Sequence, residues 1–196
     1  MDKRVPATDT LIVFALESEA RGLFDGLNVV YSGVGKVNAA YRLTQELIQW
    51  HQKRGAPPGA VLNLGSAGST HFTLGTLINC TGFIQRDFDV SALGHEVYVT
   101  PFEGIPAVLD GGTRYSAWQE GICGTGDNFV ADGKPTPWNV VDMEAYAFAK
   151  ICRLEKVPFG CLKYITDGAD GHAATTWEAG LADTAKTLRE ALTAIG

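Results

Sequence analysis

Two carboxylates in the C-terminal half of the sequence have the type and the position that chemistry requires. Glu144 belongs to the stretch 140–152, which begins apolar and extended, passes two acids and then turns helical. Asp167 stands in the polar segment 166–170, directly after the apolar run 159–165, which we predict to be a buried strand. An α/β fold collects the ends of its strands into one crevice. We therefore expect both carboxyl groups in one site, where such groups can transfer protons.

A third acid, Glu19, follows the first apolar run of the chain. Residues 11–15 are continuously apolar, as expected of a strand that is buried on both faces. The next residues predict a short helix that ends near Gly26. Glu19 then lies just beyond a strand end, where sites form in α/β proteins. Alternatively, Glu17 and Glu19 only favour the N-terminus of that helix, because the helix dipole stabilises acids there.

Two glycine-containing segments are further candidates for ligand contact. The segment 33–36, Gly-Val-Gly-Lys, precedes a predicted helix over 37–53, and the segment 65–68, Gly-Ser-Ala-Gly, forms a predicted loop after an apolar run. Glycine at such positions lets the backbone approach a ligand closely. Each segment has an alternative explanation as a tight turn or a packing turn. The first is neither a Walker loop nor a dinucleotide fingerprint, because Val30 and Asn38 stand where those motifs need glycine.

Two aromatic residues stand near these polar segments. Phe129 follows a Gly-Asp turn, so that it either joins the core or offers a flat face to a base. Stacking of a base on an aromatic ring is worth about 1–3 kcal/mol in single-stranded nucleic-acid systems. Trp177 lies between Thr175 and Glu178, whose spacing predicts a capping box at the start of the last helix. Trp177 is then explained as a staple in the core.

The composition excludes several classes of protein. The chain has 196 residues, of which 45% are hydrophobic and 19% charged, as suits one globular domain. A net charge of −6 argues against a nucleic-acid groove, and no apolar run reaches the roughly 18 residues of a membrane span. The four histidines form no metal signature. The first ten residues lack the apolar region of a signal peptide, and the four cysteines lack CxxC spacing, so we expect reduced thiols in a cytoplasmic protein.

Apolar runs and amphipathic segments alternate along the chain, which predicts an α/β architecture. We expect a three-layer fold with a mixed central sheet flanked by helices, in one domain that spans residues 1–196. Asp142 is the predicted N-cap of the helix that ends before Pro158. The predicted strands are 11–15, 28–32, 60–64, 74–83 and 159–165, and the main predicted helices are 37–53, 143–156 and 176–195.

Five short segments occur in a fixed order along the chain. They are "ALESE" at 15–19, "SGVGKV" at 32–37, "GSAG" at 65–68, "TGDNF" at 125–129, and "VDMEA" followed by "ITDGAD" at 141–145 and 165–170. Together they resemble the purine nucleoside phosphorylase and nucleosidase superfamily, and within it the methylthioadenosine/S-adenosylhomocysteine nucleosidases most closely. One such segment would be a weak signal, whereas five in order over nearly the whole chain are a strong one.

The resemblance implies a role for each candidate residue in breaking an N-glycosidic bond. In that reaction the sugar becomes cation-like and the departing purine needs a proton or a strong hydrogen bond. Asp167 matches the residue that serves purine N7 and the 6-amino group, Glu19 the base that activates water, and Glu144 the residue that holds the ribose 2′- and 3′-hydroxyls. The other implied contacts are Ser66, Ala67 and Gly68 near the sugar and the nucleophile, Met143 and Trp177 against the ribose, and Phe129 and Val130 at the base.

The implied activity is hydrolysis of a 5′-modified adenine nucleoside, with no metal and no organic cofactor. The alternatives are a nucleoside phosphorylase, a futalosine hydrolase and a non-catalytic purine-nucleoside sensor. Bacterial phosphorylases of the superfamily carry an arginine near the position of Glu19, where a carboxylate would repel phosphate. Two departures concern the nucleosidases. They commonly have an arginine where this chain has Lys163, which lacks the planar fork, and they usually have an extra hairpin where this chain is short, between residues 26 and 31.

The resemblance also implies that a neighbouring subunit completes the pocket for the 5′ substituent. The loop that reaches the neighbouring pocket aligns with Val90, Leu93 and His95. The apolar side chains of Phe88, Val90 and Leu93 are hard to explain on an exposed loop of a monomer, unless they are buried in its own core. We therefore expect a homodimer or a higher homo-oligomer whose ligand is a small-molecule purine nucleoside, with no nucleic-acid or membrane partner.

Overall fold

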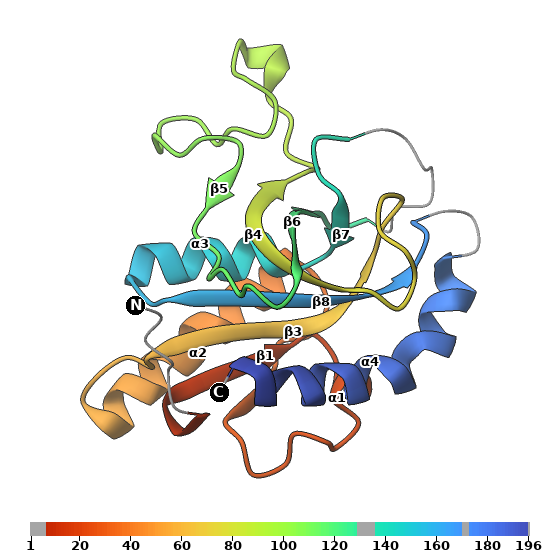
Figure 1. The fold of residues 1–196 in the computed structure, drawn as a ribbon. Coiled ribbons are helices and arrows are strands. Elements are labelled where there is room, and N and C mark those ends of the chain that lie inside the picture. Colours follow the sequence, from red (N-terminus) through yellow and green to blue (C-terminus); the bar gives the residue numbers. More distant parts are fainter. Residues whose placement is uncertain (1–6, 129–135, 170–172, 196) are drawn as a thin grey trace.

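The computed structural model describes residues 7–128, 136–169 and 173–195 (Figure 1). Among these residues, one mixed sheet contains β1 (Thr10–Phe14), β2 (Val29–Tyr31), β3 (Ala60–Gly68), β4 (Leu77–Gln85), β5 (Leu109–Asp110), β6 (Gln119–Thr125), β7 (Val140–Asp142) and β8 (Phe159–Asp167). The α-helices are α1 (Glu17–Ala20), α2 (Lys36–Arg54), α3 (Ala145–Glu155) and α4 (Ala173–Ile195), and short 3-10 helices are η1 (Ala7–Asp9) and η2 (Ser91–Leu93).

The strand order brings three strand ends to one place. β1 lies between β2 and β3, and all three are parallel. β3 is also parallel to β8, which is antiparallel to β4, while β4 continues to β6 and β6 to β7. β7 returns to β3, so that five strands form a closed ring. Gly68 at the end of β3 pairs with both Val141 of β7 and Asp167 of β8.

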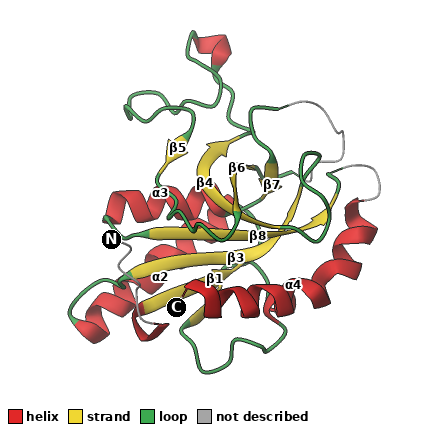
Figure 2. Ribbon diagram, in the orientation of Figure 1, coloured by secondary structure: helices red, strands yellow, loops and turns green. Residues whose placement is uncertain are grey.

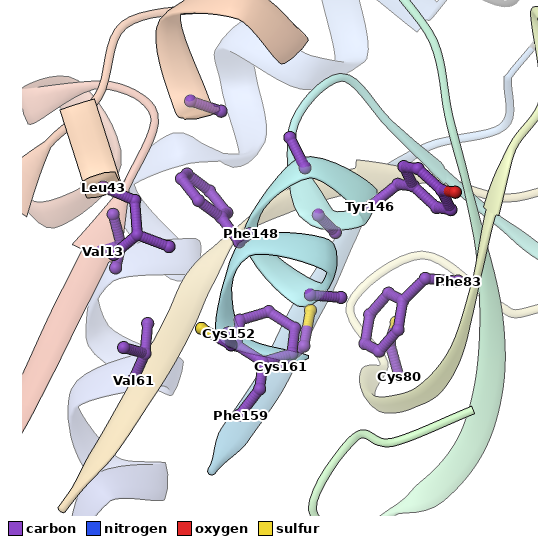
Figure 3. Packing of buried hydrophobic residues seen from close by; sticks show 14 of the residues in the cluster. Val13, Leu43, Val61, Cys80, Phe83, Tyr146, Phe148, Cys152, Phe159 and Cys161 are labelled. Carbon is purple, nitrogen blue, oxygen red and sulfur yellow. The ribbon is translucent and has the colours of Figure 1, made fainter. Parts of the chain in front are cut away.

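Helices cover both faces of the sheet, which confirms the predicted three-layer fold. Figure 2 shows α4 on one side of β1, β3 and β8, and α2 and α3 on the other. The short helix α1 packs against α4. Successive residues of β1 point to opposite faces, so that Val13 belongs to the core under α2 and α3, whereas Ile12 belongs to the core under α4. In Figure 3, Phe148 of α3 and Leu43 of α2 lie beside Val13 in the first of these cores.

Four local predictions were wrong, each for a tertiary or backbone reason. The segment 65–68 is the end of β3 and not a loop, because the pairing of β3 with β8 continues as far as Gly68. The following strand is Leu77–Gln85, shifted along the chain from 74–83. α1 ends at Ala20, because Arg21 adopts a left-handed conformation with φ +48°. α4 begins at Ala173, so Thr175 stands inside the helix and not at its N-cap position.

Helix α3 begins at Ala145 and not at Met143, and its capping differs from the prediction. Its N-cap residue is Glu144, not Asp142. The Asp142 carboxylate nevertheless accepts a hydrogen bond from the Ala145 N–H at 2.9 Å, so it still satisfies a free amide at the start of this helix. Within the described ranges, none of the helices has an apolar stretch that is long enough to cross a membrane.

Candidate active site

A cavity of about 260 Å³ opens where the ends of β3, β7 and β8 meet. It brings together residues that were predicted from distant parts of the sequence, namely Glu19, Ser66, Ala67, Gly68, Met143, Glu144, Asp167 and Trp177. Val34 of the predicted 33–36 segment lines it as well. Further lining residues that were not predicted are Ala15, Leu16, Arg86, Asn128, Val141 and Asp142. The predicted base-stacking residues Phe129 and Val130 lie outside the described residues.

Glu19 is buried and held by three donors. Its Oε1 accepts hydrogen bonds from the backbone N–H of Ser66 at 2.8 Å and from the Ser66 hydroxyl at 2.7 Å. Its Oε2 accepts from the Leu16 N–H at 3.1 Å, so the carboxylate both caps α1 and lines the cavity. Trp177 donates its indole N–H to the Ser66 hydroxyl at 2.9 Å. Trp177 is thus part of a polar chain that ends on Glu19, and not only a staple in the core.

The glycines of β3 give the carboxylates room to approach the backbone. A Cβ atom on Gly65 would stand 3.0 Å from Glu19 Oε1, and one on Gly68 only 2.4 Å from Asp167 Oδ1. Glycine is unfavourable inside a strand and often marks a close approach of another group. The small-residue segment is therefore required by the site, although it forms strand rather than loop.

Asp167 is the last residue of β8 and is also buried. Its Oδ1 accepts the N–H of Ala169 at 3.0 Å, and its Oδ2 accepts the hydroxyl of Thr166 at 3.1 Å. The same hydroxyl lies 3.3 Å from the carbonyl oxygen of Ala67 on β3. The carboxyl group is thus fixed at the strand end by its own neighbours in the chain.

Glu144 faces the same cavity from the start of α3. Its Oε1 accepts the N–H of Gly35 at 2.8 Å, so the predicted 33–36 segment reaches the site through this carboxylate. Burial raises the pKa of Glu144 to about 8, and the negative charge of Asp142 acts in the same direction, while Lys163 opposes it. Glu144 therefore changes its charge close to neutral pH.

Lys163 forms a buried ion pair that was not predicted. Its Nζ lies 2.9 Å from Asp142 Oδ2, and its side chain is 3% exposed. Asp142 also accepts the Thr125 hydroxyl at 2.6 Å. Burial would raise the pKa of Asp142, but Lys163 and the hydrogen-bond donors together lower it. A lysine inside a buried strand needs a partner, so the sequence signalled a pair, but it did not identify Asp142.

Arg86 is the second basic residue that sequence analysis did not place in the site. It lines the cavity, and its guanidinium donates to the carbonyl oxygens of Gly124 at 3.2 Å, Gly126 at 3.3 Å and Asn128. It also donates to Asn128 Oδ1 at 2.7 Å. A Cβ on Gly126 would stand 2.8 Å from its Cζ, which explains the glycine in this turn. No pattern in the sequence singled out this arginine as a lining residue.

The residues predicted to serve a neighbouring subunit do not line the cavity of their own chain. Val90, Leu93 and His95 lie in or beside η2, on the segment that extends away from the sheet at the top of Figure 1. Leu93 is 76% exposed. Within the described ranges, no group of three or more His, Cys, Asp or Glu side chains is arranged to hold a metal ion.

The chain is similar to proteins of known type. A family model described as the phosphorylase superfamily matches residues 21–196. A 5′-methylthioadenosine/S-adenosylhomocysteine nucleosidase of Actinobacillus succinogenes is 30% identical, and the match covers 90% of this chain and 81% of that protein.

Two solved structures from Helicobacter pylori share the fold. A 5′-methylthioadenosine/S-adenosylhomocysteine nucleosidase with butyl-thio-DADMe-Immucillin-A has a TM-score of 0.83 and 22% identity, with 95% of this chain and 96% of that chain covered. A futalosine hydrolase mutant has the same TM-score and identity, with 95% and 97% covered. At this identity the two structures establish the fold alone.

Proposed function

The chain belongs to the phosphorylase superfamily, and on this basis we propose that it hydrolyses the N-glycosidic bond of a 5′-modified adenine nucleoside such as methylthioadenosine or S-adenosylhomocysteine. The products are adenine and the pentose. The observation that carries the proposal is one cavity that gathers Glu19, Glu144 and Asp167, the three carboxylates that such a reaction requires. The nucleosidase relative supports the substrate class.

Asp167 serves the leaving group. As the bond to the sugar breaks, the purine takes the electron pair and must be neutralised at N7. A positioned acid contributes typically about 10²–10⁴-fold to such a step. The Ala169 N–H and the Thr166 hydroxyl hold the two oxygens of Asp167 in place at the end of β8, so that little motion is needed when the proton or hydrogen bond is delivered.

Glu19 and Glu144 act on the sugar side of the reaction. Glu19 orients the attacking water and takes its proton, while Ser66 and Trp177 fix the carboxylate through their chain of hydrogen bonds. Glu144 accepts hydrogen bonds from the ribose 2′- and 3′-hydroxyls, and Met143 packs against the ring. In its ionised form Glu144 also favours the positive charge that develops on the sugar.

The arrangement of arginines favours water over phosphate as the nucleophile. A phosphorylase holds a phosphate dianion beside the sugar, typically with arginine. Arg21 is exposed and stands just after α1. Arg86 lines the cavity, but it already donates hydrogen bonds to the turn at residues 124–128. Glu19 itself would repel a phosphate in this position.

The test is product analysis of methylthioadenosine cleavage with and without phosphate, with futalosine as a second substrate. We expect release of adenine and free pentose in phosphate-free buffer, with no acceleration by phosphate. A strict phosphate requirement with a pentose 1-phosphate product would establish a phosphorylase. Preference for futalosine over methylthioadenosine would identify the protein as a futalosine hydrolase. Binding of adenosine analogues without base release on long incubation would establish a sensor.

A second copy of the chain completes the pocket for the 5′ substituent in this proposal. Leu93 and Phe102 are 76% and 99% exposed on the segment that extends from the sheet, which is costly for a monomer in water. Val90, Leu93 and His95 are then the residues that reach the neighbouring cavity. This assembly would be contradicted if light scattering showed a monomer at assay concentration and that monomer were fully active. The four buried, free cysteines support a cytoplasmic location.

A further inference from the structure

Three loops around the mouth of the cavity are joined by one cluster of charged side chains, Lys36, Asp87 and Asp127. Lys36 begins α2, Asp87 follows β4 and Asp127 follows β6. The Lys36 Nζ contacts Asp87 Oδ1 and lies 3.4 Å from Asp127 Oδ2. We propose that this Lys36–Asp87–Asp127 cluster positions Glu144 for recognition of the sugar hydroxyls, a role that rests on the proposed function.

Backbone hydrogen bonds complete the connection between the three loops. The Lys36 N–H donates to Asp127 Oδ1 at 2.8 Å, and the Asp127 N–H donates to Asp87 Oδ2 at 2.8 Å. Each loop is therefore bonded to both of the others. Burial would raise the pKa of Asp87, but Lys36 and the Asp127 N–H lower it, so Asp87 carries its charge at neutral pH.

The cluster reaches Glu144 through a single residue. Gly35, which directly precedes Lys36, donates its N–H to Glu144 Oε1 at 2.8 Å. Gly35 has a φ of +94°, and a Cβ atom there would stand 3.1 Å from Asp127 Oδ1. Because Lys36 is fixed by both its side chain and its N–H, the neighbouring amide is held in the direction of Glu144.

The contact with Gly35 leaves Glu144 with one oxygen for the substrate. Among the described residues, Glu144 Oε2 has no hydrogen-bond partner, and the side chain lines the cavity. A carboxylate that binds two adjacent hydroxyls must keep one orientation, since small displacements weaken both hydrogen bonds. Release of the α2 N-terminus would let Glu144 turn. The value of kcat/KM would then decrease for substrates that carry the hydroxyl groups.

The experiment compares methylthioadenosine with its 2′-deoxy analogue in Lys36→Met and Asp87→Asn variants. We expect kcat/KM for methylthioadenosine to fall roughly tenfold or more, the effect of losing a hydrogen bond to a charged group. For the 2′-deoxy analogue the fall in kcat/KM should be clearly smaller, because that substrate keeps only one of the two hydroxyls that Glu144 holds. Lys36→Arg, which keeps the charge, should recover part of the activity on methylthioadenosine.

A matched control separates this positioning role from general destabilisation. Lys150 pairs with Glu103 at 2.7 Å with similar exposure, outside the set of lining residues. Lys150→Met should leave both substrates unchanged, and thermal unfolding checks that every variant is folded. Equal losses on both substrates, or no loss in either cluster variant, would overturn the proposal. If the wild-type protein cleaves neither nucleoside, the proposed function fails, and the role of the cluster fails with it.

Discussion

Replacement of Lys163 by methionine should remove the positive charge that balances Asp142 and leave the shape of the side chain almost unchanged. Lys163 and Asp142 are both buried, and their charged atoms are 2.9 Å apart. Removal of one partner from a buried ion pair costs about 3–5 kcal/mol of folding free energy, because the other charge stays buried and unpaired. Asp142 keeps the Thr125 hydroxyl and the Ala145 N–H, so we expect a loss near the lower end, about 3 kcal/mol.

The difference in unfolding free energy between the wild-type protein and the Lys163→Met variant should change with pH in one direction. In the wild-type protein the pKa of Asp142 is lowered, because its partners outweigh the effect of burial, so its stabilisation is present above the unfolded pKa of about 3.9 and is lost as pH falls through the folded value. Without Lys163, burial raises the pKa of Asp142, and the pKa of Glu144 rises further. Both groups then take up protons in the folded variant, so the stability difference from wild type should shrink as pH falls from about 8 to about 5.

Urea unfolding at these two pH values measures the difference directly, with an unchanged m-value as the sign that the unfolded state is the same. Lys150→Met is the control, because its partly exposed pair with Glu103 should contribute no more than about 1 kcal/mol. Lys163→Met combined with Asp142→Asn should recover part of the loss. A loss below about 1 kcal/mol at pH 8, or a difference that grows toward low pH, would refute the assignment of a buried charged pair.

Three further predictions concern catalysis. Asp167→Asn should stay folded but lower base release by about 10²–10⁴-fold, measured as adenine formed, because the amide cannot give up a carboxylic proton. Gly68→Ala should raise the activation free energy, measured from kcat, by more than it lowers the free energy of unfolding, measured from the melting temperature. The reason is that the new methyl would stand 2.4 Å from Asp167 Oδ1. The pH profile of kcat/KM should rise toward pH about 8 as Glu144 ionises, and Lys163→Met should move this rise to higher pH; a flat profile between pH 6 and 9 would contradict the role of Glu144.

The parts of the site that could be predicted from the sequence are those that directly follow apolar runs. Glu19 follows β1 and Asp167 ends β8, and each run is apolar because both faces of the sheet are covered. Parallel strands carry their ends to one edge, so these acids meet in space. The alternative for Glu19, an acid that only favours a helix N-terminus through the dipole, agrees with its place in the first turn of α1, where one of its oxygens also accepts the Leu16 N–H.

The contacts between loops could not be predicted, because no periodic pattern governs them. Lys36 pairs with Asp87, 51 residues later, and with Asp127, 91 residues later. The prediction of a loop at 65–68 was wrong for a related reason. Its composition is typical of a turn, but pairing with β8 extends the strand through it, and the approach of two carboxylates accounts for its glycines. Local preference was overridden by partners that are distant in the sequence.

The charges around the cavity connect its stability to its proposed chemistry. Glu19, Asp142, Glu144 and Asp167 all line it, together with the cation Arg86, and the cation Lys163 pairs with Asp142. These buried carboxylates cost folding free energy when they are ionised; for Glu144, burial and then the negative charge of Asp142 raise the pKa to about 8. The same carboxylates favour a sugar that becomes positively charged and disfavour a phosphate dianion. The free-energy cost of these carboxylates is therefore offset only when the cation-like sugar forms. An interaction that appears only at that stage accelerates the reaction, whereas one that is equally strong with the bound substrate only strengthens binding.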